Sequence, residues 1–511
     1  MIQTYTHANL LAPKSPARDW CIDPSSCDQF WKPFGNAEGL ELVAKSRTID
    51  LNLREVVGEV IRKQYIQCGI PIPDGLKEFQ SGAQVVCAGH QLVVGGGAAF
   101  FHYKMLSALR WSRHLRSSGI PAITVFWMAS EDHDFEEISK VIGRSSPENS
   151  IFEWRPQSRI DESPVGRLQW DETTEKSWQS WCHELGIRSG RKAENMELRE
   201  RMRHWLLDYF PDEDFLVVDG DDAELKACAQ FLWDAEWKGE GIENALRAVS
   251  QDFISRWNQA PLVPRSNNLF VLSDQGQRVR ADRWELKHSA EAWKQLKPAQ
   301  NSPNAALRPL YQEYLLQSAG FVGGPSEIGY WLLLGKAFAF HGIQMPSLIL
   351  RDGGIVLDEA SRVLASSLEW NPELGWWTGE EAVRRWIDQR MQKTPEIENS
   401  ISNLSEALIR YASNLSGDAI PTTRAGLARM EKEYARIQKK WRKIFKQTHA
   451  SECDAIEKLF EEVIRVQGQP QERVFHVGSL IEKDGGWELF RTRWFESLKD
   501  CSESQFVVFH S

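Results

Sequence analysis

The sequence predicts an α/β protein: a core built on a parallel sheet, with a long antiparallel helical hairpin near its C-terminal end. Three observations support this class. Short apolar strands alternate with helical stretches through the first two thirds of the chain. From about residue 376 the pattern becomes entirely helical, and it then carries two apolar seams with heptad spacing. The expected domains are a core over 1–375, the helical hairpin over 376–470, and a segment over 471–511 that returns to the core.

The parallel sheet is predicted by one supersecondary unit. An apolar strand at 84–88 is followed by a glycine-rich loop at 89–97, a helix at 98–117 and a second apolar strand at 121–129. Two strands joined by a helix in this way are parallel, and the crossover is right-handed. Further strands of the same kind are expected at 215–218 and 347–350.

Other parts of the core are less regular. Residues 1–80 are expected to be mostly helical, with one clear helix from 51 to 67. A polar, Trp-rich stretch at about 150–210 is expected to be an insertion in the sheet topology. Residues 268–272, followed by a Ser-Asp-Gln-Gly turn, predict a hairpin strand. Residues 506–509 predict an edge strand.

The hairpin is predicted by apolar residues spaced alternately by three and four. The first stretch contains Ile397, Ile401, Leu404, Leu408, Tyr411 and Leu415, and the second contains Leu427, Met430, Tyr434, Ile437, Trp441 and Ile444. Thr394 and Pro395 are expected to start the first helix. The second helix is expected to run from about 422 to 466, roughly 65 Å at about 1.5 Å per residue.

A hairpin of this kind packs its two seams against each other, so another face would hold a partner chain. The candidates for that face are Ile409, Phe445, Phe460 and Ile464. We therefore expect a homodimer formed through an antiparallel coiled coil. The alternative is an ordinary amphipathic helix pair that packs on the core.

Composition excludes several classes of partner. The formal net charge is −10 and no arginine-rich tail is present, so nucleic acid is not expected as the main partner. There is no signal-peptide pattern and no apolar run of about 18 residues, so no membrane span is expected. The eight cysteines form no CxxC pair. Free thiols in a reducing cytoplasm are expected, without a structural zinc site.

Two segments near the first strands carry residues suited to chemistry. The loop 89–97 has glycines that would let a backbone approach a phosphate at a helix N-terminus. It lacks the dinucleotide and P-loop signatures, so glycine used for tight packing is an equally good explanation. The cluster 130–134 follows a buried strand, at the edge where such sheets bind ligands. Its acidic residues favour an acid–base or metal role over a solvated helix start.

Two later segments are candidates of the same kind. The stretch 301–310 contains Arg308, which could clamp a carboxylate or a phosphate. The stretch 323–331 contains Glu327 just after a Gly-Gly-Pro turn. This carboxylate could hold an ammonium group, or it could only complement a helix dipole. Taken alone, each segment is explained as well by structure as by function.

Taken together, the segments resemble one family. Residues 88–104 resemble its TGQQ…TG(P)LY…YK segment, and 126–135 resemble FW-[IM]-A-x-EDHD-[FW]. Residues 302–309 resemble SPN-x-x-LRP, 323–331 resemble GGPGEIAYW, and 471–473 also fit. The chain is thus similar to the cysteine ligases of bacillithiol biosynthesis, the BshC family.

The resemblance implies a Rossmann-like core, similar in plan to class I aminoacyl-tRNA synthetases, with insertions and a dimerising coiled coil. It implies an ATP-dependent ligase that joins the carboxylate of cysteine to the amine of glucosaminyl-malate. ATP would be a co-substrate and Mg²⁺ could accompany it. Activation through an acyl-adenylate or an acyl-phosphate remains open. Two alternatives remain: a related amino-acid ligase acting on another amine, and a non-catalytic, nucleotide-binding dimeric interaction protein.

The expected site follows from the matched segments. The residues expected to be catalytic are Asp132, His133, Asp134 and Glu327, and those expected to bind substrate or nucleotide are Gly89, His90, Gln91, Gly97, Tyr103, Lys104, Asn304, Arg308, Gly324 and Tyr330. Asp132 would hold an ammonium group, and His133 would take a proton as the amide forms. The sequence departs from the family pattern at His90, Gly96, Ala98, Phe100 and Ser326, which leaves the amine substrate open.

Overall fold

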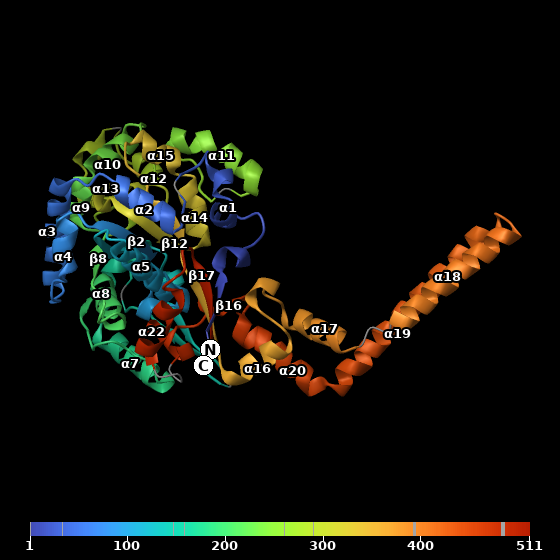
Figure 1. Ribbon diagram of the computed structural model, residues 1–511. Coiled ribbons are helices and arrows are strands. Elements are labelled where there is room, and N and C mark those ends of the chain that lie inside the picture. Colours follow the sequence, from blue (N-terminus) through green and yellow to red (C-terminus); the bar gives the residue numbers. More distant parts are fainter. Residues whose placement is uncertain are drawn as a thin grey trace. The chain divides into compact units, whose positions relative to one another are not determined.

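The chain consists of two compact units. The computed structural model describes residues 2–510 except 33, 147, 158, 260, 290, 392–394, 482–485. The first unit comprises Met1–Val356 and Glu472–Ser511, and the second comprises Leu357–Gln471 (Figure 1). The boundary therefore comes earlier than the predicted one at 376, and the C-terminal segment belongs to the first unit.

A five-stranded parallel sheet forms the centre of the first unit. Its strands are β2 (Gln84–Gln91), β3 (Ala122–Ala129), β8 (Phe215–Asp219), β12 (Ser318–Gly323) and β13 (Ser347–Leu350). Their order is β13-β12-β2-β3-β8, and every neighbouring pair is parallel. The strands are almost entirely buried, which explains their continuous apolar sequences. The predicted Rossmann-like parallel sheet is confirmed.

Helices cover the sheet and form the rest of the first unit. In chain order they are α1 (Pro16–Ile22), α2 (Ala37–Ser46), α3 (Leu51–Gln67), α4 (Gly75–Gln80), α5 (Ala99–Ser117), α6 (Phe135–Ile138), α7 (Glu172–Leu185), α8 (Leu198–Tyr209), α9 (Ala223–Cys228), α10 (Gln230–Trp237), α11 (Glu243–Trp257), α12 (Ala281–Glu285), α13 (Arg308–Leu316), α14 (Pro325–Leu332), α15 (Gly335–Phe340), α21 (Gly478–Ile481) and α22 (Gly486–Leu498). The crossover helix α5 packs on both β2 and β3. Helix α3 begins where the Asp50 carboxylate accepts hydrogen bonds from the amides of Asn52 and Leu53.

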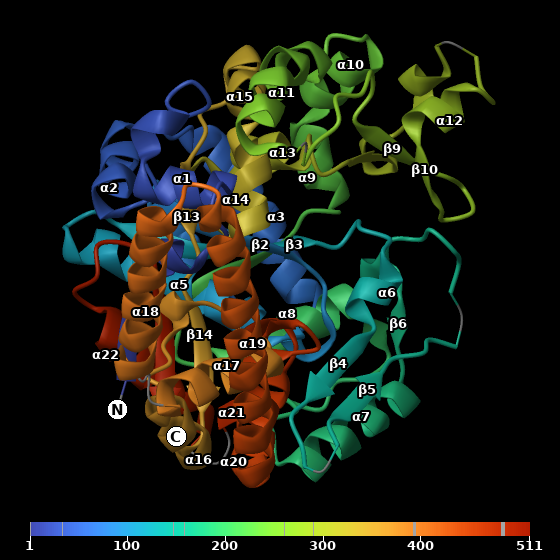
Figure 2. The same ribbon diagram turned by 90° about the vertical axis from the view of Figure 1, so that its right-hand side faces the viewer.

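Two insertions interrupt the sheet. The first lies between β3 and β8 and contains the small antiparallel pairs β4 (Lys140–Gly143) with β5 (Ser150–Glu153) and β6 (Gln169–Trp170) with β7 (Met196–Glu197) (Figure 2). Its core is a cluster of buried indoles from Trp154, Trp170, Trp178 and Trp205. The abundant tryptophans are thus partly explained by packing in this insertion.

The second insertion lies between β8 and β12. It contains an antiparallel sheet of β10 (Arg278–Arg280), β9 (Leu269–Leu272) and β11 (Asn301–Pro303), in that order. The predicted hairpin strand is β9, and β10 is its partner. The third strand, β11, has no clear strand signal, since it is three residues long and ends in proline.

The two ends of the chain meet in a third sheet. Strand β17 (Gln505–His510) lies between β1 (Ile2–Thr6) and β14 (Gly353–Leu357). The prediction of an edge strand at 506–509 was therefore wrong, because the N-terminal strand pairs with its free side. That N-terminal strand was itself missed, since 1–80 were expected to be mostly helical.

The second unit is mainly helical. Its elements are α16 (Glu359–Ser367), α17 (Gly379–Arg390), α18 (Pro395–Leu415), α19 (Ala419–Thr448), α20 (Ala450–Lys458), a π-helical turn (Leu459–Ile464), β15 (Arg465–Val466) and β16 (Gln469–Pro470). Helices α18 and α19 lie side by side (Figure 2). The predicted continuous helix from 422 to 466 was wrong, because the helix is interrupted at His449. The predicted cap at Thr394 lies outside the described residues.

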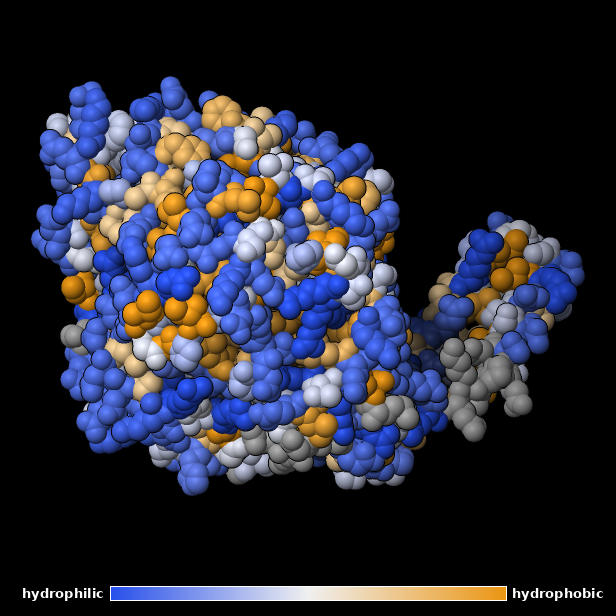
Figure 3. Space-filling model, turned by 60° about the vertical axis from the view of Figure 1, so that its left-hand side comes forward, coloured by the Kyte–Doolittle hydropathy of each residue, from blue (hydrophilic) through white to orange (hydrophobic). Residues whose placement is uncertain are grey.

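The apolar residues of this unit fall into two groups. Phe460 and Ile464 are fully buried, and Phe460 packs against Trp370 and Trp377. The prediction that they face a partner chain was therefore wrong. By contrast, several seam residues of the helix pair keep 40–65% of their surface exposed: Leu404, Leu408, Tyr411, Leu415, Ile437, Trp441 and Ile444. Figure 3 shows apolar surface between polar side chains on this helix pair.

None of the described helices combines the length and the apolar character that a membrane-spanning helix needs.

Candidate functional site

The strand order places a topological switch point at the carboxyl edge of the large sheet, between β2 and β12, where a ligand-binding crevice is expected. Strands β2 and β12 are neighbours, but β2 continues through α5 to β3 on one side, and β12 continues through α14 and α15 to β13 on the other. Sheets of this topology bind ligands where the two connections diverge. His90 and Gln91 lie at the end of β2, and Gly324 follows β12.

An ion pair between buried Lys104 and partly buried Glu327 joins the two sides of this switch point, the crevice expected between β2 and β12. Lys104 on α5 places its Nζ 2.6 Å from Glu327 Oε2 and donates a hydrogen bond to the carbonyl of Gly89 at 2.5 Å. Glu327 also accepts a hydrogen bond from the Gly324 amide at 2.8 Å, which caps α14. Burial lowers the pKa of Lys104. Burial would raise the pKa of Glu327, but the charge of Lys104 outweighs it and lowers that pKa. The 2.6 Å contact between the two groups is that of an ion pair.

His90 is a neutral aromatic side chain near the carboxyl end of β2. Burial and the nearby charge of Lys104 lower its pKa to about 4. Its ring lies 5.5 Å from the rings of both Phe100 and Phe101. His90 and Phe100 are two of the positions at which the sequence departs from the family pattern, and the structure places them side by side.

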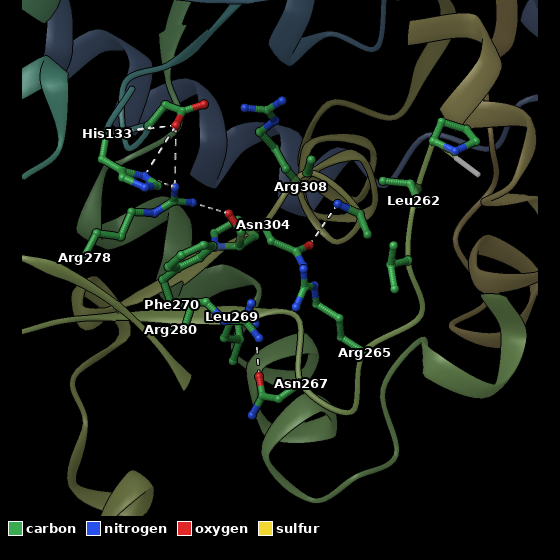
Figure 4. Close-up of a pocket in the computed structure, with 16 residues that line it drawn as sticks. His133, Leu262, Arg265, Asn267, Leu269, Phe270, Arg278, Arg280, Asn304 and Arg308 are labelled. Carbon is green, nitrogen blue, oxygen red and sulfur yellow. Dashed lines mark hydrogen bonds and ion pairs between the residues drawn. The ribbon is translucent and has the colours of Figure 1, made fainter. Parts of the chain in front are cut away.

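The acidic cluster after β3 lies next to this crevice. Asp132 accepts a hydrogen bond from Gln91 Nε2 at 2.9 Å, which connects the ends of β2 and β3. Burial would raise the pKa of Asp132, but the guanidinium groups of Arg278 and Arg308 lower it. His133 Nδ1 lies 3.1 Å from a guanidinium nitrogen of Arg278 (Figure 4).

A cavity of about 380 Å³ opens beside His133 and Arg278. The residues that line it are Asp132, His133, Pro261, Leu262, Val263, Arg265, Asn267, Leu269, Phe270, Arg278, Arg280, Pro303, Asn304, Ala305, Ala306 and Arg308. Four of these are arginines and one is a carboxylate, so the cavity favours an anionic ligand. Arg278 and Arg280 were missed by the sequence analysis. A signal for them was present in the sequence. The two arginines are two residues apart on a short strand, and this spacing places both side chains on the same face of the strand.

Arg308 and Asn304 are brought together at the start of α13. The Asn304 side chain accepts hydrogen bonds from the amides of Ala306 and Leu307, which fixes the turn that presents Arg308. Burial would lower the pKa of Arg308, but the Tyr330 phenol and the Glu131 carboxylate raise it. Arg308 is therefore a charged group at the cavity wall.

Three predicted site residues lie elsewhere. Asp134 is exposed and caps α6 by accepting a hydrogen bond from the Glu137 amide. Tyr103 is fully buried, and its ring stacks on Trp494 with centroids 4.8 Å apart. Gly97 is buried and has a positive φ of 60°. Of the fourteen predicted site residues, only Asp132, His133, Asn304 and Arg308 line the cavity.

The glycine-rich loop is used for close packing. A Cβ at Gly95 would lie 2.1 Å from the Trp178 ring, and one at Gly96 would lie 2.6 Å from the His102 ring. All three consecutive glycines are buried. Of the two interpretations of this loop, tight packing is the one that the geometry supports, since a phosphate needs an open backbone surface.

Beneath the loop, His476 is buried in the neutral form, and this predicts acid sensitivity. Burial lowers its pKa to about 4, below the ordinary value near 6.5. The unfolded chain therefore binds a proton that the folded chain does not between these pH values. This histidine therefore does not change the free energy of unfolding with pH above about pH 6.5. As the pH falls from 6.5 towards 4, it lowers that free energy by up to about 1.4 kcal/mol per pH unit. We expect His476→Gln to reduce the slope of unfolding free energy against pH by up to this amount in urea titrations.

The control is His183→Gln, at an exposed histidine. It should leave the slope unchanged. Equal slopes for the His476 variant and the unaltered protein would contradict the assignment of a neutral buried His476.

The acidic groups were also considered as metal ligands. Across the described part of the chain, no group of three or more His, Cys, Asp or Glu side chains is arranged to hold a metal ion.

Comparison with known proteins identifies the family. Residues 6–352 match the family described as "Bacillithiol biosynthesis BshC, N-terminal Rossmann-like domain". A protein of Cytophaga hutchinsonii is 25% identical over 95% of this chain and 94% of its own length. One from Flavobacterium johnsoniae is 26% identical over 74% of this chain and 75% of its own, and one from Thermus thermophilus is 26% identical over 78% and 83%.

All three relatives carry the name "Putative cysteine ligase BshC". A cysteine ligase is an enzyme, so the prediction of a ligase family is confirmed. The family match covers well over half of the 511 residues and includes the whole parallel sheet with the cavity at its carboxyl edge. On this evidence, the chain belongs to the BshC family of bacillithiol biosynthesis.

Proposed function

We propose that this protein joins cysteine to the amine of glucosaminyl-malate in an ATP-dependent, amide-forming step. The observation that carries the proposal is the cavity beside the crevice, where four arginines face a single carboxylate, Asp132. The expected reactants are anionic: a triphosphate, a cysteine carboxylate and the two carboxylates of malate. Arginine binds such groups through paired hydrogen bonds. The name of the relatives supports cysteine as the acid that is activated.

The chemistry sets the order of events. Amide formation from a free carboxylate is uphill in water, so ATP must first convert the cysteine carboxylate to an acyl-adenylate or an acyl-phosphate. The amine then attacks the activated carbonyl carbon, and AMP or phosphate leaves. Mg²⁺ would arrive with the triphosphate, because it usually needs only one or two protein carboxylates. Arg308 and Arg278 would hold anionic oxygens during this sequence, and the crevice at His90 would receive the amine.

The direct test is to incubate the purified protein with ATP, Mg²⁺, cysteine and glucosaminyl-malate. We expect the cysteinylated thiol to form with one equivalent of either AMP and pyrophosphate or ADP and phosphate, and the nucleotide product identifies the intermediate. Glucosamine and other sugar amines serve as comparison substrates. A folded protein that forms no amide from cysteine with any of these amines would contradict the proposal.

Thiol profiling of a deletion strain tests the same proposal in the cell. We expect the cysteinylated thiol to be absent and its amine precursor to accumulate. An unchanged thiol profile would count against this substrate.

We also propose that α18 and α19 form a coiled coil that makes a homodimer. Support comes from the exposed seam, since residues such as Leu408 and Trp441 remain 40% and 44% exposed within the helix pair. Apolar surface of this extent on a helix pair is typical of an interface. We expect Leu408→Gln combined with Trp441→Gln to convert a dimer into a monomer of about 58.6 kDa in light scattering. Arg410→Gln, at an exposed polar position, is the control. A variant that stays dimeric would exclude this seam as the interface.

A further inference from the structure

Hydrogen bonds and a ring contact fix the position of the Arg278 guanidinium. Nε donates to Ser302 Oγ at 3.0 Å, and one terminal nitrogen donates to the Pro303 carbonyl at 2.6 Å. The guanidinium lies over the Phe270 ring at 4.0 Å. The side chain is only 6% exposed. The other terminal nitrogen lies 3.1 Å from His133 Nδ1 and 3.7 Å from Asp132 Oδ1.

This contact determines which nitrogen of His133 carries the proton. A guanidinium has only donors and stays protonated in proteins, so it can approach a ring nitrogen at this distance only if that nitrogen offers a lone pair. Nδ1 is therefore the acceptor, and a neutral His133 carries its hydrogen on Nε2.

The opposite tautomer is disfavoured by the same geometry. A proton on Nδ1 would have to point to Asp132 Oδ1, which is 3.6 Å away and beyond a good hydrogen bond. It would also set two donors against each other across the 3.1 Å contact with Arg278. Asp132 is already engaged, because Oδ2 accepts from Gln91 and Oδ1 accepts from the His133 amide.

We propose that Arg278 is a positioning residue that fixes His133 as a hydrogen-bond donor through Nε2–H, so that His133 binds an anionic oxygen of the substrate and does not act as the general base. This inference rests on the proposed function, which supplies the substrate. His133 lines the cavity, and Nε2 is the ring nitrogen not turned towards Arg278 (Figure 4). A phosphate oxygen of ATP and a carboxylate oxygen of cysteine or malate share the required chemistry.

The tautomer is measured without turnover. ¹⁵N-histidine NMR of the whole protein at about pH 8, where histidine is ordinarily neutral, is compared with the His133→Gln variant to assign the resonance. We expect Nδ1 to show the shift of an unprotonated acceptor and Nε2 that of a protonated nitrogen. A proton on Nδ1 would overturn the inference, whatever reaction the protein catalyses. Arg278→Lys should change this spectrum, and Arg283→Lys, at an exposed arginine of α12, should not.

Turnover measurements then distinguish the two possible roles of His133, hydrogen-bond donor and general base. The side chain of glutamine can place an N–H group near the position of Nε2, but it cannot accept a proton. We expect His133→Gln to keep kcat/KM within about 10-fold and His133→Leu to lose about 10- to 100-fold, as for one hydrogen bond to a charged group. Loss of 10²-fold or more in both variants would instead identify a general base.

Calorimetry identifies the oxygen that His133 binds. ATP, cysteine and glucosaminyl-malate are titrated separately into the unaltered protein and into His133→Leu. We expect one of the three to bind about 10-fold or more weakly to the variant, and that ligand supplies the oxygen. Unchanged affinity for all three would overturn the donor role while leaving the proposed ligase activity intact.

Discussion

Replacing Lys104 with Met is expected to lower the free energy of unfolding by about 3 kcal/mol and turnover by about 10²-fold. Lys104 is 1% exposed, and its partner Glu327, at 2.6 Å, is 26% exposed. Removing one member of a buried ion pair costs about 3–5 kcal/mol, and the partial exposure of Glu327 places this pair at the lower end of that range, about 3 kcal/mol. The pair also connects the two strands that flank the crevice, so its loss displaces the groups expected to bind substrate. Urea titration and a coupled turnover assay measure the two effects.

A second variant separates the effect on folding from the effect on activity. Lys104→Met combined with Glu327→Gln removes both charges but keeps a group that can accept from the Gly324 amide. We expect it to recover much of the lost stability and little of the turnover. Lys63→Met, in an ion pair whose side chains are 53% and 57% exposed, is the control and should leave the stability nearly unchanged, because solvent screens exposed ion pairs. Normal turnover in the double variant would show that the ion pair is not part of the proposed site.

The part of the sheet that could be predicted is the part where the apolar pattern of the strands differs clearly from that of the helix between them. In the unit β2–α5–β3, the helix and the second strand were predicted to within one residue, because the strand is continuously apolar and the helix is long; the first strand runs three residues beyond its predicted end at 88. Strand β12 was missed, because its sequence, Ser-Ala-Gly-Phe-Val-Gly, has little strand character. The order of the strands could not be predicted at all, since it depends on two insertions that carry no strand-pairing signal.

The hairpin shows a different limit. The seam spacing correctly predicted two long helices, but spacing alone does not say which apolar residues are buried. Phe460 and Ile464 continue the helical pattern, yet they lie in a π-helical turn in the core of the second unit. Leu408 and Trp441 fit the same pattern and remain exposed. Tertiary packing decides between these outcomes, and a single sequence does not contain it.

The site was predictable only where the residues are close in the chain. Asp132 and His133 follow one strand, and Asn304 and Arg308 lie in one turn, so local motifs found all four. Arg278 reaches His133 across 145 residues of sequence. It does so because the β9–β10 hairpin of the second insertion carries it to the cavity.

Glu131 was within the predicted cluster, and it is 1% exposed with no hydrogen-bond partner for either carboxylate oxygen among the described residues.

Arg308→Gln is expected to lower kcat/KM by about 10²- to 10³-fold. Arg308 lines the cavity, and the Tyr330 phenol and the Glu131 carboxylate raise its pKa, so its charge is permanent. Removing one partner from a desolvated charge pair with a substrate anion costs about 3–4 kcal/mol, which corresponds to this factor. Arg308→Lys keeps the charge but loses the planar fork, so we expect an intermediate loss.

Separate titrations of ATP, cysteine and glucosaminyl-malate into Arg308→Gln show which anion the guanidinium binds, since only that ligand should lose affinity. The matched control is Arg283→Gln, which removes an exposed arginine of the same insertion that does not line the cavity. It should leave kcat/KM unchanged. If Arg308→Gln behaves like this control, the guanidinium does not contact a substrate. The anionic groups would then have to be held by Arg265, Arg278 or Arg280, the other three arginines of the cavity wall.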